Sequence, residues 1–385
     1  MIQGIKVRLE PNNKQKTKLF QYAGTARFIY NWTLAKQEEN YKNGGKFIND
    51  GDLRKELTQL KKQQQYKWLN NISNNVSKQA IKDACEAYKR FFKGLAKRPK
   101  FKSKKHSPPK FYQDTDKIQF TATHVKFEGF ASSKKKNKQK LNWVKLSEKN
   151  RIPTDVKYIN PRVSFDGMNW YISVGVEIED IKPELTTESI GIDVGVKDLA
   201  ICSNGIVSKN INKTHRVKKL EKKMRRLQRR VSRKYIKNKK GESYVKTSNI
   251  IKLEKEIVKL HIKLANIRTN YRHEESTKIV RNKPSRIVME CLNVKGMMKN
   301  RHLSKAIAQQ GLDKFKTMIK YKSERYGIEF VEADRWFPSS KLCSCCGAIK
   351  KDLKLSDRVY KCECGNVMDR DFQASINLSR YKLVV

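Results

Sequence analysis

The chain has 385 residues, of which 86 are Lys or Arg and 38 are Asp or Glu, so its formal net charge is +48. That length is enough for two or three domains and excludes a short peptide or an isolated charged tail. No apolar run approaches the roughly 18 residues of a membrane-spanning helix, and the opening residues, MIQGIKVRLEP, lack the apolar segment of a signal peptide. We therefore expect a soluble, cytoplasmic protein whose partner is a polyanion and not a membrane. Charge alone would equally suit a protein that only coats nucleic acid.

The first hundred residues predict one strand followed by helices. Residues 5–9 alternate apolar and basic side chains and the run stops at Pro11, after which apolar residues recur at helical spacing to about residue 97. Within this segment, residues 78–93 combine an apolar stripe with a row of lysines and arginines. Such a helix packs its apolar face on a core, and its basic face is available to phosphates.

From residue 99 the pattern changes to short alternating runs. Five strands are expected, separated by turns such as Asp166-Gly167, at residues 118–123, 125–127, 142–146, 162–165 and 170–178. Short strands at close spacing are typical of a small all-β unit, so we expect a barrel-like domain here.

The remainder of the chain predicts a mixed α/β domain that follows a linker around residues 183–188. It is expected to begin with a strand hairpin at residues 189–196 and 199–202, followed by two basic helices folded against each other at 213–280. A strand at 286–290, a helix at 305–326 and a last strand at 328–333 are expected to follow.

Three acidic positions near apolar segments are candidates for chemistry. Asp193 stands inside an apolar strand between two glycines, and Glu290 ends another apolar run, so an unpaired charge at either position would be costly. Asp371 heads a short amphipathic segment, with Asp369 as the alternative acid at that end. Convergent carboxylates suit Mg²⁺, and a pair of such ions stabilises the attacking and leaving oxygens of a phosphodiester displacement. These residues therefore favour a metal-dependent nuclease.

The segment around Asp193, GIDVG, has an alternative interpretation as the phosphate loop of an actin-like or sugar-kinase-like ATPase. That interpretation requires later Gly-rich loops for phosphate and adenosine, and none occurs between Asn204 and Ser340. The nuclease interpretation is favoured accordingly.

Four cysteines near the carboxyl end form two closely spaced pairs, Cys343-x-x-Cys346 and Cys362-x-Cys364. This spacing is typical of a tetrahedral zinc ribbon, in which four thiolates leave no open coordination position, so the zinc is expected to be structural. Cys345 competes with Cys343 for the first pair. The remaining cysteines, Cys85, Cys202 and Cys291, lie in apolar patterns and are expected to be reduced thiols.

Several of these segments resemble, in their order, the motifs of the transposon-encoded TnpB/OrfB family, which is related to the type V CRISPR effectors. GIDVGVKDLAICSNG is similar to the first RuvC motif, IVMECLNVKGMMKN to the second, and SSKLCSCCG with YKCECGNVMDRDFQASINL to the zinc ribbon that runs into the third. VRLEPNNKQKTKLFQYAGTARFIYNW also resembles the family's opening helical segment. The resemblance thus covers most of the chain.

The resemblance implies that Asp193, Glu290 and Asp371 are the catalytic carboxylates and hold two Mg²⁺ ions. Asp371 is preferred over Asp369 because the family's third acid directly precedes a segment that is matched here by residues 372–375. The thiol ligands of a structural Zn²⁺ would be Cys343, Cys346, Cys362 and Cys364. Two features depart from the family pattern: Gln373 stands where Asn is commoner, and Cys-x-Cys replaces the more frequent Cys-x-x-Cys.

The resemblance further implies an RNA-guided DNA endonuclease associated with a transposable element. Its partners would be a guide RNA derived from the element and a double-stranded DNA target that carries a short recognised motif. The excess positive charge suits a protein that holds RNA and a heteroduplex mostly by backbone and shape.

Other functions are weighed against the same residues. A catalytically weak RNA-guided DNA-binding regulator would be expected to lack one of the acids, whereas all three are present. A transposase of the tyrosine type would need a His-x-His motif, which the six histidines do not form. A guide-free RuvC-like nuclease stays open as an alternative.

The expected architecture is a multi-domain α/β protein. An RNase H-like, RuvC nuclease domain with a zinc ribbon insertion is preceded by a helical recognition domain and a small β-barrel, wedge-like domain. The expected boundaries are residues 1–10 and 99–185 for the wedge-like domain, 11–98 for the helical domain, 186–342 and 366–385 for the nuclease domain with its helical hairpin at 213–280, and 343–365 for the ribbon.

Overall fold

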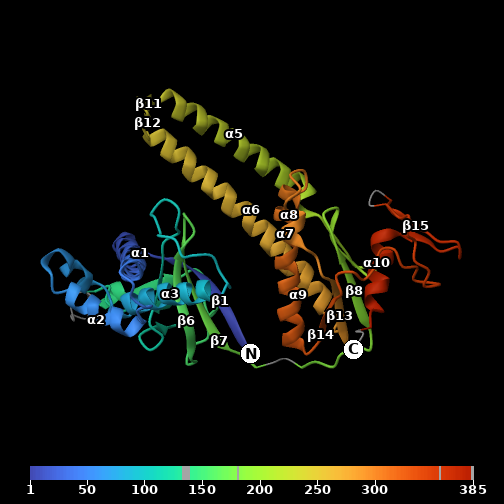
Figure 1. Ribbon diagram of the computed structural model, residues 1–385, viewed down its shortest axis with the longest axis horizontal. Coiled ribbons are helices and arrows are strands. Elements are labelled where there is room, and N and C mark those ends of the chain that lie inside the picture. The colour runs from blue at the N-terminus through green and yellow to red at the C-terminus, as the bar shows by residue number, and fades with distance from the viewer. Residues whose placement is uncertain (132–138, 180–181, 355–356, 383–385) are drawn as a thin grey trace. The chain divides into compact units, whose positions relative to one another are not determined.

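The computed structural model describes residues 1–131, 139–179, 182–354 and 357–382 of the chain. The chain divides into two compact units, Met1–Ile178 and Glu179–Val385 (Figure 1). Each unit has a hydrophobic core of its own. Within the described residues, none of the helices combines the length and the apolar character that crossing a lipid bilayer requires.

The first unit is built on a seven-stranded antiparallel sheet. Its middle strand is β1 (Ile2–Glu10), in which Ile5, Val7 and Leu9 are buried and alternate with exposed residues. The strand order from edge to edge is β2 (Lys110–Tyr112), β6 (Tyr158–Phe165), β7 (Trp170–Glu177), β1, β5 (Trp143–Leu146), β4 (His124–Lys126) and β3 (Gln119–Phe120). The sequence predicts a barrel-like unit, and β2 and β3 are the two edge strands of the sheet. Phe111 on β2 and Phe120 on β3 nevertheless belong to the same hydrophobic core, so the sheet curves around that core without the two edges pairing among the described residues.

Helices of the first unit pack on this sheet and on one another. They are α1 (Asn13–Lys42), α2 (Asp50–Leu60), α3 (Asn74–Phe92) and the 3-10 helices η1 (Gln64–Asn71) and η2 (Lys140–Asn142). A capping box starts α1, because Asn12 accepts from the Gln15 N–H at 2.9 Å and Gln15 accepts from the Asn12 N–H at 3.0 Å. Tyr22 on α1 and Val76 on α3 enter the core of the sheet. The helices also form clusters of their own, for example around Leu53 and Ile81, so the helical segment has its own packing and is joined to the sheet through the shared core.

The second unit is built on a mixed five-stranded sheet in the order β10-β9-β8-β13-β14. β8 (Ser189–Val194), β9 (Asp198–Cys202) and β10 (Val207–Lys209) form an antiparallel meander, whereas β13 (Arg286–Glu290) and β14 (Glu329–Ala333) run parallel to β8. β8 is therefore the central strand. Most of its residues are buried, as expected of a strand covered on both faces.

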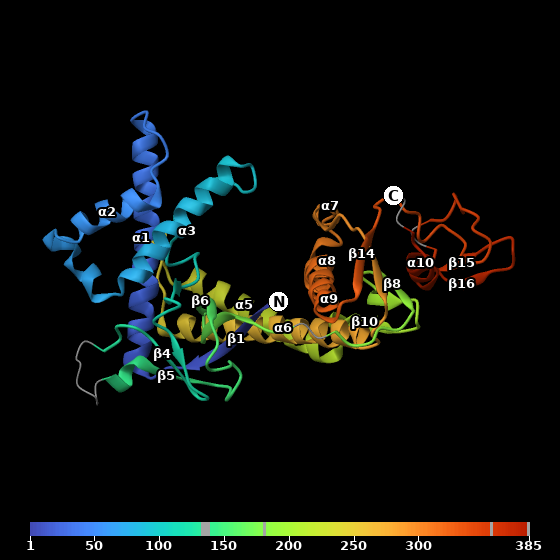
Figure 2. The same ribbon diagram turned by 90° about the horizontal axis from the view of Figure 1, so that it is seen from below.

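Helices cover both faces of this sheet (Figure 2). On one face, α6 (Ser248–Val280) and α9 (Leu312–Tyr326) share a core with Ile192 and Met289. On the other face lies α10 (Arg370–Ser379), where Leu378 packs on Val288. α5 (His215–Lys237) and α6 form a long hairpin with the short strands β11 (Lys239–Lys240) and β12 (Ser243–Tyr244) at its tip. The other elements are η3 (Ile211–Lys213), α7 (Val294–Met297), α8 (Ser304–Gln310), β15 (Val359–Lys361) and β16 (Val367–Asp369).

The single helix expected at residues 305–326 is two helices, so that prediction is wrong. α8 and α9 are separated at Gly311, whose φ of 65° is left-handed. Glycine adopts this conformation without steric penalty, so it ends α8 and lets α9 begin in a new direction.

α10 lies directly against the backbone of β8. The contact point is Gly191, where an added Cβ would overlap with the carbonyl oxygen of Ser375 and the amide nitrogen of Ser379. Both are main-chain atoms, so no side-chain rotation relieves the overlap. Because side chains alternate along a strand, Asp193 lies on the same face of β8 as Gly191 and faces α10. The close approach therefore sets how near α10 comes to Asp193.

We expect Gly191→Ala to lower the free energy of unfolding by about 1–3 kcal/mol, the usual effect of overpacking. The measurement is urea denaturation. Gly195→Ala is the matched control, since the nearest atom to an added Cβ there is the Asp198 carbonyl oxygen at 3.5 Å, an ordinary contact. A Gly191→Ala protein as stable as the wild type would contradict the close approach of α10.

Candidate active site

Two of the expected acids lie side by side on β8 and β13. The parallel register pairs Met289 with Ile192, so the residues that follow, Glu290 and Asp193, are neighbours across the two strands. The two carboxyl groups interact directly, so the charge state of each affects the pKa of the other. Glu290 also accepts from the backbone N–H of Val194.

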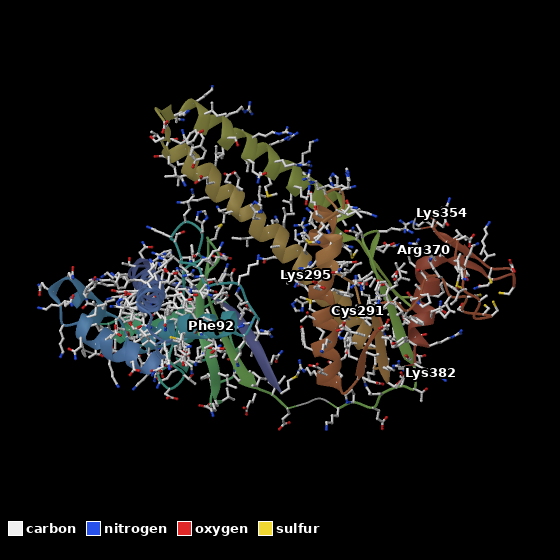
Figure 3. The ribbon with its side chains drawn as sticks, viewed as in Figure 1. Phe92, Cys291, Lys295, Lys354, Arg370 and Lys382 are labelled. Carbon is white, nitrogen blue, oxygen red and sulfur yellow. The ribbon has the colours of Figure 1, made fainter. Side chains whose placement is uncertain are left out.

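Asp371 reaches the same region from the start of α10, where Figure 3 labels Arg370. Asp369 is the N-cap of this helix, and its side chain accepts from the N–H groups of Asp371 at 2.9 Å and Phe372 at 3.1 Å. The Asp371 carboxylate pairs with Arg370 at 3.1 Å and with Arg358 at 3.7 Å. Asp369 therefore caps the N-terminus of α10, whereas the Asp371 carboxylate pairs with the guanidinium groups of Arg358 and Arg370.

Burial and mutual repulsion dominate the electrostatics of this site. Burial raises the pKa of Glu290 to about 7, and the charge of Asp371 acts in the same direction. Burial also raises the pKa of Asp193 well above its usual value, with further contributions from Glu290 and Asp371. Two adjoining buried carboxylates are not both charged without a counter-ion, so the pair either shares a proton or takes a cation. Oxygen donors of this kind suit a hard divalent ion such as Mg²⁺.

This electrostatic arrangement predicts a pH-dependent stability. Because the pKa of Glu290 is raised to about 7 in the folded state from 4.5, the folded state binds the proton more tightly, and stability falls as pH rises between these values. In EDTA, Glu290→Gln should be roughly 1–3 kcal/mol more stable than the wild type at pH 8 and equally stable near pH 4.5.

The measurement is urea denaturation at both pH values. Mg²⁺ added at pH 8 should stabilise the wild type more than Glu290→Gln, because the variant lacks one charged ligand. A stability difference that does not change with pH would count against the raised pKa.

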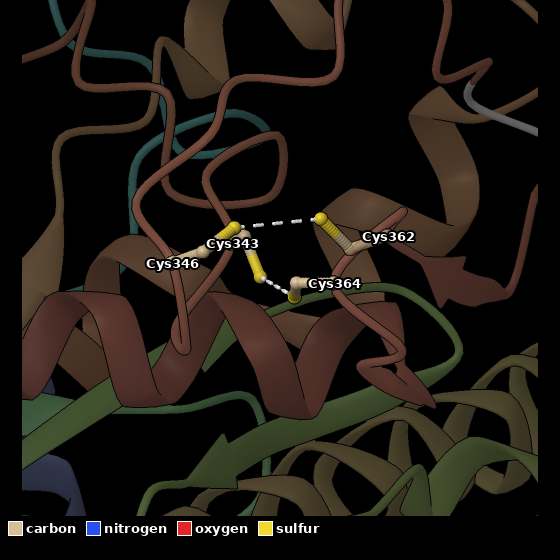
Figure 4. A group of neighbouring side chains, drawn as sticks. All are labelled: Cys343, Cys346, Cys362 and Cys364. Carbon is tan, nitrogen blue, oxygen red and sulfur yellow. Dashed lines mark hydrogen bonds between the residues drawn. The ribbon is translucent and has the colours of Figure 1, made fainter.

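A cluster of four thiols lies beside this site (Figure 4). The sulfur atoms of Cys343, Cys346, Cys362 and Cys364 all lie within 4.8 Å of one another. Two of the separations, Cys343–Cys364 and Cys346–Cys362, are 3.6 Å. A tetrahedral Zn²⁺ with Zn–S bonds of about 2.3 Å sets its sulfurs roughly 3.8 Å apart, so the donor set fits zinc. Cys345, the alternative ligand, is exposed and outside the group.

The electrostatics of the cluster favour a thiolate at Cys343, whereas at Cys346 and Cys364 the lowering effect of backbone N–H groups is outweighed by hydrogen bonds from neighbouring sulfurs, which raise the pKa of Cys346 and raise that of Cys364 to about 12. Although burial opposes it, the backbone N–H groups of Cys346 and Cys345 and the side-chain amide of Asn366 lower the pKa of Cys343 to about 6. The Asn366 amide nitrogen is 3.4 Å from the Cys343 sulfur. A deprotonated sulfur is the form that binds metal.

Buried amides fasten this ribbon to α10. Gln373, fully buried, donates to the Leu342 carbonyl at 2.8 Å and accepts from Ser344 at 3.0 Å and from Asn366 at 3.2 Å. Asn366 in turn contacts the Cys343 sulfur. The helix that carries Asp371 is thus connected through hydrogen bonds to the thiol cluster.

We expect Cys346→Ser to release about one zinc ion per chain and to lower the melting temperature, because a tetrahedral site needs all four thiolates. The measurements are elemental analysis and thermal unfolding of the pure protein. Cys345→Ser is the matched control and should keep its zinc, since this neighbouring thiol is outside the cluster. If the folded wild type contained no zinc, the assignment would be wrong.

Sequence patterns do not indicate the two arginines on Asp371. Arg370 stands between the two candidate acids, and the alternation Asp-Arg-Asp is the one signal that could have pointed to it. Arg358 meets Asp371 through the pairing of β15 with β16, which leaves no local pattern. Gln310 is also missed: its amide donates to the Gly195 carbonyl at 3.2 Å and holds the loop that follows β8.

Three family models match the chain. They are "Helix-turn-helix domain" of the OrfB_IS605 type at residues 1–46, "Probable transposase" of the OrfB_IS605 type at residues 173–301, and "Cas12f1-like, TNB domain" at residues 313–378. Together they match more than half of the chain.

Two curated relatives match almost throughout. The "Putative RNA-guided DNA endonuclease" of Streptomyces pristinaespiralis is 28% identical over 97% of this chain and 87% of its own. The "Putative RNA-guided DNA endonuclease InsQ" of Escherichia coli strain K12 is 29% identical over 94% of this chain and 87% of its own. A chain in the "Cryo-EM structure of the Cas12f1-sgRNA-target DNA complex" shares the fold, with a TM-score of 0.60, 14% identity and 98% of each chain covered.

The fold and the site together place the chain among mixed α/β proteins that carry acidic residues on adjacent parallel strands and a four-cysteine cluster near the carboxyl end. The family models and the relatives cover both units of the chain. The matches to the OrfB_IS605 models and to these relatives support the assignment of the chain to the TnpB/OrfB family.

Proposed function

We propose that this protein is an RNA-guided DNA endonuclease of the TnpB type, associated with a transposable element, which hydrolyses DNA phosphodiester bonds at a RuvC-like site. The observation that carries the proposal is the pair of half-buried, interacting carboxyl groups of Asp193 and Glu290 beside Asp371. Relatives matched over nearly the whole chain bear the name of such an endonuclease. The strand order, with the first acid on the central β8 and the second on β13, supports an RNase H-like assignment for the second unit.

The three acids would hold two Mg²⁺ ions, which when bound stabilise the charge on the attacking and leaving oxygens of the phosphodiester. Asp193 and Glu290 would hold the ions as charged carboxylates, since the charged form is the better ligand. The Val194 N–H contacts the Glu290 carboxylate and would help to hold it in position. Asp371 would contribute its oxygens to the same site, and Arg358 and Arg370, which pair with it, would provide positive charge for a phosphate.

A basic surface on α5 supports the nucleic-acid part of the proposal. The only acidic residue of this 23-residue helix is Glu221, which pairs with Arg268 on α6 at 2.6 Å. Most of the lysines and arginines of α5 are exposed. Such a surface suits the phosphates of a guide RNA derived from the element, or of its heteroduplex with target DNA, while base pairing supplies the sequence specificity.

The proposal gives each segment a role. Residues 186–342 and 366–385 form the nuclease domain, with a structural zinc ribbon at 343–365. In the first unit, residues 11–98 form the recognition segment, and residues 1–10 and 99–185 the wedge-like segment. These roles rest on the family to which the chain is assigned.

Copurification and cleavage test the proposal. The protein is expressed with the DNA that flanks its gene, and the bound RNA is sequenced. A set of duplexes that match the free end of that RNA, with all base combinations beside the match so that the recognised motif is included, is then offered in Mg²⁺ or in EDTA. We expect one discrete RNA and cutting in Mg²⁺ alone. Cutting without any bound RNA would favour the guide-free nuclease, and intact DNA in every condition would contradict an endonuclease.

Single alanine substitutions of Asp193, Glu290 and Asp371 should each lower the cleavage rate by roughly 1,000-fold or more, because residues that act as a unit fail together. Binding of RNA and target should be nearly unchanged, since it rests on distant basic surfaces. The measurements are a single-turnover cleavage assay and a binding assay on the same samples.

The control is Asp369→Asn. Asp369 caps α10, so replacing it by alanine would destabilise the helix that carries Asp371 by about 1 kcal/mol. Asparagine keeps the cap and removes only the charge. Cleavage by Asp369→Asn at close to the wild-type rate is expected, and an inactive Asp369→Asn beside an active Asp371→Ala would move the third ligand by two residues.

A further inference from the structure

Trp336 is an exposed aromatic residue on a well-fixed loop. It is 80% exposed, the most exposed of the large hydrophobic side chains in the described part of the chain. The backbone N–H of Trp336 donates to the Asp334 carboxylate at 2.7 Å, and the backbone N–H of Asp334 donates to the Tyr381 hydroxyl at 3.1 Å. The neighbouring Phe337 packs edge-on against Tyr381, with ring centroids 4.9 Å apart. The loop is therefore anchored on both sides of an indole that stands in solvent.

This loop begins where the carboxylate-bearing strands end. Ala333, the last residue of β14, pairs directly with Glu290. Neighbouring strands lie about 4.8 Å apart and three residues span at most roughly 11 Å, so the Cα of Trp336 is within roughly 16 Å of that of Glu290. At the roughly 3.4 Å rise of a stacked strand, that is within about five nucleotides of the site.

The surroundings of the indole suit a nucleotide better than a protein partner. The guanidinium of Arg335 lies 5.3 Å from the Trp336 ring centroid, and the acidic Asp334 precedes Arg335 in the sequence. The exposed apolar surface at this point is therefore a single ring flanked by charged side chains. Protein docking faces need larger contiguous apolar patches. An exposed ring beside an arginine is the combination that stacks an unpaired base and contacts its phosphate.

We propose that Trp336 stacks on an unpaired base of the DNA strand being cut, with Arg335 on an adjacent phosphate, and so holds the scissile phosphodiester at the carboxylate site. The proposal rests on the endonuclease function proposed above. Trp336 is a substrate-positioning residue, and its contact does not depend on sequence, because every base presents a flat face.

Abasic substitution tests this contact. Target duplexes carry a tetrahydrofuran abasic residue at successive positions of the cut strand near the cleavage point, and single-turnover rates are measured in Mg²⁺. For the wild type, one or two positions should slow cleavage by roughly 10-fold, the scale of one lost base stack. Trp336→Ala should be slowed by a similar factor on intact DNA and should be indifferent to the abasic residue at those positions. Trp336→Phe should restore most of the rate and the sensitivity.

Tyr321→Ala is the matched control. Tyr321 is an exposed aromatic side chain on α9, which covers the face of the sheet opposite to Asp193, so this variant should cleave and respond to abasic residues like the wild type. The proposal is overturned if Trp336→Ala cuts intact DNA at the wild-type rate, or if it keeps the wild-type response to every abasic position. A wild type that leaves intact DNA uncut overturns the endonuclease function itself, which separates the two failures.

Discussion

The main chain of α10 rests on the main chain of β8 at Gly191, and the arrangement of the second unit depends on that contact. A hydrogen atom is all that separates the strand from the helix backbone there, so α10 comes closer to the sheet than ordinary side-chain packing permits. Burial of Leu378 against Val288 stabilises the helix in this position. Asp371, one turn before Ser375 at the start of this helix, is thereby placed near Asp193. A small residue in a strand thus determines where an acid from the far end of the chain is located.

Placing these carboxylates close together raises the free energy of their charged forms, and a bound cation would lower it again. Burial raises the pKa of Asp193 and Glu290, so without metal the pair keeps a proton that exposed acids would lose near neutral pH. Asp371 is neutralised differently, by Arg358 and Arg370. A divalent ion bound between the three acids would replace both the proton and the guanidinium groups, since it would supply positive charge to all three carboxylates. The same repulsion that destabilises the empty arrangement therefore favours cation entry.

Local periodicity accounts for what the sequence predicts well and for what it misses. The strand at residues 5–9 is confirmed within β1, because a buried alternation is visible in a single segment. β2 is missed, since its three residues are too few to display a period. Asp193 and Glu290 are noticeable because acids are rare in apolar strands, although their role as metal ligands stays a prediction. Arg358, one of the two arginine partners of Asp371, comes from a separate segment, and such a pairing leaves no local pattern in the sequence.

The identity of Gln373, where the family more commonly has Asn, has a structural explanation in the connection between the ribbon and α10. Its side chain is one methylene longer, and its amide leaves the helix to meet Leu342, Ser344 and Asn366 at once. The side-chain amide of Asn366 in turn donates to the sulfur of Cys343. Because this side chain is fully buried, each hydrogen bond that a displaced ribbon would break leaves a polar group without water to replace its partner. Order in the ribbon and the position of the helix that carries Asp371 are therefore coupled, so a metal held by the four thiols would influence the carboxylate site without contacting the substrate.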